Sequence, residues 1–137
     1  MSLFNVLNVA GSGMTAQQTR LNVTASNLAN AENTAATPEA VYQPRHPLFA
    51  AVMNEATGGE DAVGVKVEGI IAADGDAKKI YQPGNPIADE QGYVYMTNVN
   101  AVEEMANMIS ASRSYQMNVD VMNTAKDLLT RTLRLGE

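Results

Sequence analysis

The chain has 137 residues, of which 45% are apolar but only 5% aromatic, and it contains neither tryptophan nor cysteine. This length suits one domain, or one small domain on a helical stalk, and the scarcity of large aromatic anchors argues against a compact enzyme core. The lack of cysteine excludes disulfides, thiolate metal sites and thiol catalysis, and a net charge of -6 without a basic stripe argues against nucleic-acid binding.

The charge is unevenly distributed along the chain. Residues 1–34 carry one basic and one acidic side chain, residues 35–100 carry four and nine, and residues 101–137 carry four and five. The acidic surplus therefore lies in the middle of the chain, between two nearly neutral ends. This distribution is typical of end helices that pack inside an assembly while an acidic piece faces water. We expect three parts, with bounds at residues 1–34, 35–99 and 100–137.

Residues 3–33 show the apolar spacing of an amphipathic helix. Two rows repeat every seven residues and run side by side along the helix. The first row is Leu7, Met14, Leu21 and Leu28, and the second is Leu3, Ala10, Gln17 and Thr24. Gly11 and Gly13 each cost about 1 kcal/mol relative to alanine inside a helix. We therefore expect this helix to form only against a partner, although a plain helix in a monomeric bundle is the alternative. No stretch near the start has the pattern of a cleavable signal peptide.

The middle of the chain predicts irregular structure followed by a small β-rich patch. Residues 34–62 contain three prolines and an expected exposed loop at residues 57–61, so we predict no regular element there. Residues 63–71 alternate apolar and polar side chains like a strand with one wet face. Residues 74–76 predict a turn, residues 83–86 a second and stronger turn, and residues 79–81 and 93–97 short strands.

Residues 100–136 predict a long helix of about 50 Å. Asn100 and Glu103 form a capping-box pattern at its start, and Gly136 is placed to end it. Two rows run along it in heptads: Ala101, Met108, Tyr115, Met122 and Leu129, and, four residues on, Met105, Ser112, Val119, Lys126 and Leu133. Amphipathic helices at both ends of a short chain are expected to pair with each other. The fold class is therefore α+β and mainly α, an antiparallel coiled-coil pair with a β-rich insertion.

Candidate chemistry is sparse. His46 is the only histidine and has no nucleophile motif nearby, so a catalytic role is not expected. Asp74 and Asp76 lack the remaining ligands of a calcium loop and indicate a solvated turn instead. The run from Gly11 to Gly13 does not follow a strand and is no phosphate cradle. Arg113 either pairs with a neighbouring helix or is simply solvated. We predict no enzyme, no cofactor and no metal.

Several segments carry a resemblance to a known family. Residues 21–31, with the motif Asn27-Leu28-Ala29-Asn30, resemble the N-terminal signature of bacterial flagellar rod and hook proteins. Residues 1–5, 81–86, 92–94, 111–116, 118–119 and 132–136 extend the similarity along nearly the whole chain, and they are most similar to the proximal rod members. One departure is Thr97, where the family pattern implies a proline, and we expect it to loosen the entry to the following helix.

The resemblance implies a structural subunit of the proximal rod of the flagellar basal body, assembled into a helical tube that transmits torque. It implies export in an unfolded state through the flagellar type III apparatus and a final place in the periplasmic part of the rod. The implied partners are other rod proteins, the adaptor between rod and membrane ring, and further copies of the chain. Neither nucleic acid nor a small-molecule substrate is implied. A soluble coiled-coil binding module or export chaperone is the alternative.

The subunit interface is expected along both end helices. Its predicted residues are Leu3, Leu7, Met14, Leu21, Asn22, Asn27, Leu28 and Asn30 from the first helix, and Met105, Met108, Ile109, Arg113, Tyr115, Val119, Met122, Leu129 and Leu133 from the second. The amides of Asn22, Asn27 and Asn30 are hypothesised to form hydrogen bonds across subunits and to fix their register.

Overall fold

A computed structural model describes residues 3–53 and 63–135 of the chain. Within these described residues, two long helices precede and follow five strands and one short 3-10 helix along the chain. In chain order these are α1 (Leu3–Ala29), β1 (Thr34–Ala35), η1 (Pro38–Ala40), β2 (Arg45–Met53), β3 (Val63–Ala72), β4 (Lys78–Tyr81), β5 (Tyr93–Met96) and α2 (Ala101–Leu135). The loop predicted at residues 57–61 and the helix stop predicted at Gly136 lie outside the described residues.

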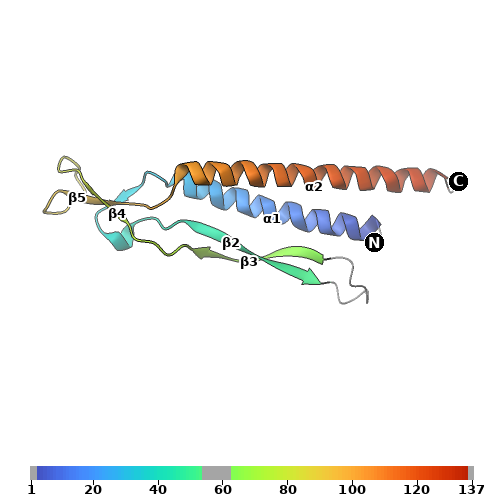
Figure 1. The fold of residues 1–137 in the computed structure, drawn as a ribbon, viewed down its shortest axis with the longest axis horizontal. Helices are drawn as coiled ribbons and strands as arrows, with labels where there is room; N and C mark the ends of the chain where they lie inside the picture. The colour runs from blue at the N-terminus through green and yellow to red at the C-terminus, as the bar shows by residue number, and fades with distance from the viewer. Residues whose placement is uncertain (1–2, 54–62, 136–137) are drawn as a thin grey trace.

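The molecule is long and narrow because its helices lie antiparallel along one axis (Figure 1). The 27 residues of α1 and the 35 residues of α2 correspond to about 40 and 52 Å of helix at 1.5 Å per residue. Both chain ends lie at the same end of the molecule, where α2 extends past the start of α1 (Figure 1). The predicted antiparallel pair of end helices with a small β insertion is confirmed.

The seam between the helices agrees with the predicted rows on α1 and with only one predicted row on α2. The row from Ala101 to Leu129 is half-buried as expected. The second predicted row is wrong in part, since Met105, Lys126 and Leu133 are exposed while Ser112 and Val119 are half-buried. The buried positions lie three residues on from the first row instead of four, at Glu104, Ala111 and Ala125. Gly11 and Gly13 of α1 face Met122 and Asn118 of α2, and the lack of side chains at the two glycines lets the helices lie close there.

The strands β2 and β3 form a hairpin that runs along the side of α1 opposite α2 (Figure 1). The prediction of irregular structure for residues 34–62 is wrong for the short elements β1 and η1 and for residues 45–53, which form β2. Proline is tolerated at position 47 because each strand of a two-stranded sheet has a free edge, where no ladder donor is needed. The strand predicted at residues 63–71 is confirmed as β3. The two strands pair from Arg45 with Ala72 outward, with a register shift at Leu48.

A three-stranded sheet in the order β1-β5-β4 closes the other end of the molecule (Figure 1). The predicted turn at residues 83–86 is confirmed, with the Asn85 amide donating to the Gln82 carbonyl at 3.0 Å. Gly92 has a φ of 81°, a left-handed conformation that suits glycine. Residues 73–77 form an irregular connection between the two sheets and not the tight turn predicted at residues 74–76.

Asn100 caps α2 as predicted. Its Oδ1 accepts hydrogen bonds from the amides of Val102 at 3.1 Å and Glu103 at 3.5 Å. Thr97 does not loosen the entry to this helix, because it is fully buried and its amide donates to the Asn33 carbonyl at 3.3 Å. A proline at that position could not make this bond. No helix in the described part of the chain is both long and apolar enough for a membrane span.

Candidate subunit interface

The predicted interface residues of α1 lie mainly inside the chain. Each of the apolar ones is half-buried in a helix that packs against both α2 and the hairpin; they are Leu3, Leu7, Met14, Leu21 and Leu28. Asn22 is exposed. Among the predicted α1 residues, Asn22 is therefore the one most open to a neighbouring subunit.

The predicted interface residues of α2 divide into two groups. Those facing the seam are half-buried: Met108, Tyr115, Val119, Met122 and Leu129. Those facing water are Met105, Ile109, Arg113 and Leu133. Ile109 and Leu133 keep 56% and 74% of their surface exposed, so in the described chain they contribute little to the core. The second group is free for contact with another protein.

Further exposed apolar side chains on α2 fall outside the two predicted rows, and the heptad pattern does not reveal them. They are Val102, Met117, Val121, Leu128 and Leu135. A search for apolar residues on every face of the helix would have found them. Near the free end of the helix pair, Val121 and Leu128 face Leu3 and Val6 of α1 across an apolar groove of about 360 Å³. We call this the end groove.

Asn27 is a hydrogen-bonding centre within the chain. It has an exposed fraction of 0%. Its Nδ2 donates to the Arg45 carbonyl at 2.8 Å and to Glu104 Oε2 at 2.9 Å, while its Oδ1 accepts from Tyr42 Oη and from the Arg45 amide, both at 2.9 Å. An amide group has two donor hydrogens and two acceptor sites, and all are used here. The hypothesis that Asn27 bonds across subunits is therefore wrong in this conformation.

Asn30 also bonds within its own segment. Its Nδ2 donates to the Ser26 carbonyl at 2.8 Å, and its Oδ1 accepts from Asn33 Nδ2 at 2.6 Å. The Ser26 carbonyl also accepts from the Asn30 backbone amide at 3.2 Å, so Asn30 binds the last turn of α1 through both its backbone and its side chain. The two asparagines of the family motif thus terminate α1 and tie it to the rest of the chain.

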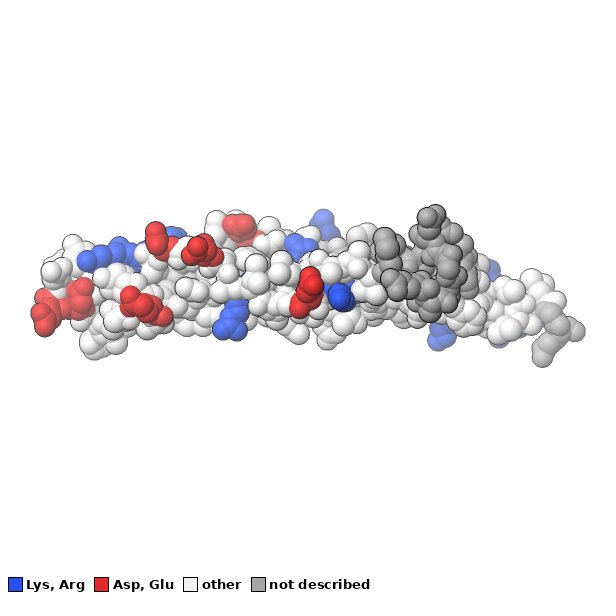
Figure 2. Space-filling view, turned by 90° about the horizontal axis from the view of Figure 1, so that it is seen from below, with Lys and Arg blue, Asp and Glu red and all other residues white. Residues whose placement is uncertain are grey.

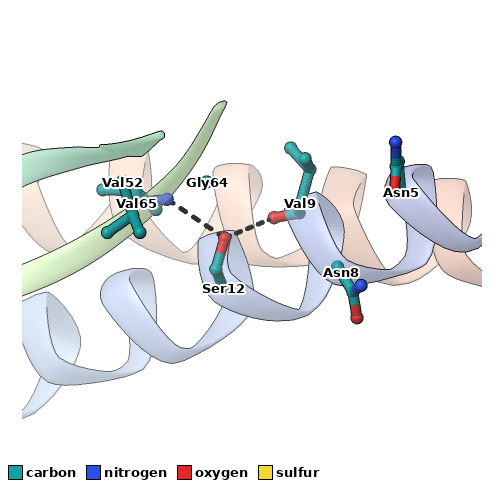
Figure 3. A pocket seen from close by; sticks show the side chains of 7 residues that line it. All are labelled: Asn5, Asn8, Val9, Ser12, Val52, Gly64 and Val65. Atoms are coloured by element: carbon teal, nitrogen blue, oxygen red, sulfur yellow. Dashed lines mark hydrogen bonds between the residues drawn. The ribbon is translucent and has the colours of Figure 1, made fainter. Parts of the chain in front are cut away.

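Ser12 joins α1 to the free edge of the hairpin (Figure 3). Its Oγ donates to the Val9 carbonyl at 2.8 Å and accepts from the Val65 amide at 3.1 Å. An unpaired strand edge is a template for unwanted strand pairing, so this hydroxyl protects β3 at one point. A groove of about 340 Å³ separates the hairpin from the first turns of α1 beside this contact, with Asn5 and Asn8 on its helix side (Figure 3).

Acidic and basic side chains are distributed differently on the face of the molecule shown in Figure 2. On this face, acidic side chains gather over the half that carries the three-stranded sheet, and basic ones are spread along the length. Within the sheet, the Lys79 ammonium lies 4.2 Å from the centre of the Tyr93 ring, a cation–π contact. The described residues include no group of three or more histidine, aspartate or glutamate side chains that could hold a metal.

The sequence comparisons agree with the fold. Residues 7–35 match the family described as flagella basal body rod protein, and residues 90–135 match the C-terminal family of the flagellar basal body rod FlgEFG proteins. These two ranges include most of α1 and all of α2, the two helices that form the pair.

Similar proteins include flagellar basal-body rod proteins FlgC from three sources. The chain is 47% identical to that of Escherichia coli O6:H1, 45% to that of Salmonella typhimurium and 47% to that of Buchnera aphidicola subsp. Schizaphis graminum. Each alignment covers 100% of both chains. The predicted resemblance is confirmed, and the chain belongs to the family of the flagellar basal-body rod protein FlgC.

Proposed function

We propose that this chain is a structural subunit of the proximal rod of the flagellar basal body. The observation that carries the proposal is the set of exposed apolar side chains along α2, in a helix pair whose own seam is already filled. Ile109, Met117 and Leu133 are each more than half exposed on α2. Single exposed apolar residues are ordinary, but a series along one long helix is typical of a surface that packs against other chains.

The shape of the chain suits torque transmission. Long helices can contact several neighbours at once, so a twisting load is shared among many contacts. Contacts between different surfaces of successive subunits generate a helical tube when they do not close into a ring. Of the interface residues predicted from sequence, the exposed ones are Asn22, Met105, Ile109, Arg113 and Leu133, and the proposed interface consists of these together with the end groove.

The proposed partners are other rod proteins, the adaptor between rod and membrane ring, and further copies of this chain. Membership in a basal-body rod family supports the first of these most directly. The flagellar type III export apparatus is the proposed route to the periplasmic part of the rod. Folding after export is compatible with the seam, because glycine and asparagine in α1 lower its stability as a helix alone.

The proposal is tested with the double variant Ile109→Ser/Leu133→Ser. Both side chains already face water, so the fold of the single chain should be unchanged. Incorporation of the tagged chain into purified basal bodies should be lost, and with it swimming in soft agar. The matched control is Gln116→Ser, an exposed position on the same helix, which should incorporate normally. Normal incorporation of the double variant would contradict the proposed interface.

A second candidate is a soluble coiled-coil binding module or export chaperone, because exposed apolar helix faces also suit that role. A chaperone should form a stable helical dimer by itself. A rod subunit should remain a monomer whose ends are cleaved early by protease. Circular dichroism, light scattering and limited proteolysis of the dilute chain separate the two functions.

A further inference from the structure

The buried amide of Asn27 lies where three parts of the chain meet. It sits in the last turn of α1, it contacts the first turn of α2 through Glu104, and it contacts the base of the hairpin through Arg45. Tyr42, in the segment before the hairpin, supplies its remaining bond. We call the cluster of Asn27, Tyr42, Arg45, Glu104 and Asn107 the Asn27 joint.

At the base of the hairpin, the side chain of Asn27 forms the two backbone hydrogen bonds with Arg45 that a neighbouring strand would otherwise form. Its amide pairs with both the amide and the carbonyl of Arg45, the first residue of β2. The adjacent Pro44 carbonyl accepts from the Ala73 amide at 2.7 Å, just beyond the end of β3. The position of the whole hairpin relative to α1 is thus fixed at its base by one side chain.

On the helix side, Glu104 holds the Asn27 amide. Its side chain is 5% exposed and accepts from Asn27 Nδ2 at 2.9 Å and from Asn107 Nδ2 at 3.4 Å. Arg20 of α1 donates to Asn107 Oδ1 at 3.1 Å, which links this chain of bonds back to the first helix. An ionised carboxylate accepts and cannot donate, so it orients the Asn27 amide with its nitrogen toward α2.

We propose that the Asn27 joint makes the pairing of α1 with α2 and the anchoring of the β2–β3 hairpin one cooperative event, with Glu104 as its positioning residue. If α2 moves away, the Asn27 amide loses the acceptor that fixes its orientation while its other side still has to pair with Arg45. A buried polar group left without a partner is costly, so the hairpin base opens as well. The inference goes beyond rod assembly, since it concerns the single folded chain.

The first test compares Glu104→Ala with Glu103→Ala in the full chain by amide hydrogen exchange. Both acids lie in the first turn of α2 and interact with the same end of the helix dipole, but only Glu104 touches the joint. Exchange of the Arg45 and Ala73 amides, which lie outside α2, should be on the order of ten- to a hundredfold faster in Glu104→Ala. The conservative variant Glu104→Gln should restore slow exchange, since its amide oxygen still accepts from Asn27.

The second test approaches the joint from the opposite side and does not depend on whether Glu104→Ala folds. Tyr42→Phe removes one hydroxyl and keeps the ring. Because coupling between sites is reciprocal, this variant should also speed exchange of the Glu104 amide, which donates to the Asn100 carbonyl at 3.0 Å.

Either of two results overturns the inference. One is an unchanged Glu104 amide in Tyr42→Phe. The other is equal exchange of Arg45 and Ala73 in the two glutamate variants, including the case in which neither amide is protected in the unmodified chain. The joint would then be a set of local contacts without coupling.

Discussion

Gly11 and Gly13 lie two residues apart on α1, and an added methyl group meets different surroundings at the two positions. At Gly11 the nearest atom to a new Cβ is Met122 Cε at 3.6 Å, an ordinary van der Waals contact. Replacing glycine by alanine inside a helix gains about 0.8–1 kcal/mol. We therefore expect Gly11→Ala to stabilise the chain by about that amount, which corresponds to a rise in melting temperature of roughly 2–5 °C for a chain of this size.

At Gly13 the same gain meets a larger penalty. A new Cβ would lie 3.0 Å from Asn118 Nδ2, 3.1 Å from its Oδ1 and 3.2 Å from its Cγ. The Asn118 side chain cannot move freely, because its Nδ2 donates to the Ser114 carbonyl at 3.0 Å. Loss of that bond costs about 1 kcal/mol and overpacking a further 1–3 kcal/mol. The net effect of Gly13→Ala is therefore a destabilisation of about 1–3 kcal/mol after the helix gain is subtracted.

Urea denaturation followed by circular dichroism measures both changes. The two variants should differ by at least about 2 kcal/mol, with opposite signs. In an Asn118→Ala background the obstructing amide is absent, so Gly13→Ala should become stabilising, with a coupling of about 2–4 kcal/mol between the two positions. Equal stabilisation by Gly11→Ala and Gly13→Ala, or strict additivity with Asn118→Ala, would refute the close approach of the helices at this point.

Three further changes test other parts of the fold. In thermal melts, Gly92→Ala should destabilise the chain by about 1–3 kcal/mol, because Gly92 has a φ of 81° and a new Cβ would lie 3.0 Å from the ring of Tyr81. The control Gly84→Ala, where a new Cβ has no atom within 4 Å, should be nearly neutral in the same assay. Asn100→Ala should cost about 1 kcal/mol in urea denaturation through loss of the α2 cap, and Asn100→Asp should restore it. The double variant Ser12→Cys/Gly64→Cys should form a disulfide on oxidation, because a Cβ at position 64 lies 3.7 Å from that of Ser12. The disulfide is detected as a gel shift without reductant. A persistent free dithiol would contradict the position of the hairpin beside Ser12.

The helix pair could be predicted because its signals are local and repeated. Heptad spacing, a capping asparagine and the length of the apolar pattern together define α2 from the order of its residues alone. The choice between Ala111 and Ser112 as a seam residue could not be made in this way. It depends on how closely the helices approach, and that distance is set by glycine and alanine on the opposite helix. A small buried residue contributes little to the heptad pattern of large apolar residues.

The hairpin and the Asn27 joint could not be predicted from local sequence patterns. Three prolines between residues 38 and 47 indicate a loop, yet β2 begins at Arg45 because a two-stranded sheet has no second neighbour to be disrupted. The family motif marks Asn27 as a residue of consequence, but the motif alone does not reveal its partners. Glu104 is 77 residues away along the chain, and only the antiparallel register brings the two together.

The two kinds of contact in this chain have different consequences for assembly. The polar bonds of Asn27, Asn30 and Ser12 are completed within the chain, and buried hydrogen bonds fix one geometry because each misplaced donor or acceptor is costly. The exposed side chains of α2, such as Ile109 and Leu133, are apolar, and apolar contacts are non-directional. A subunit that must meet non-identical neighbours in a rod can thus keep one internal geometry while its outer surface adapts to several partners. The specificity of assembly should accordingly depend more on the shape set by the Asn27 joint than on any single exposed residue.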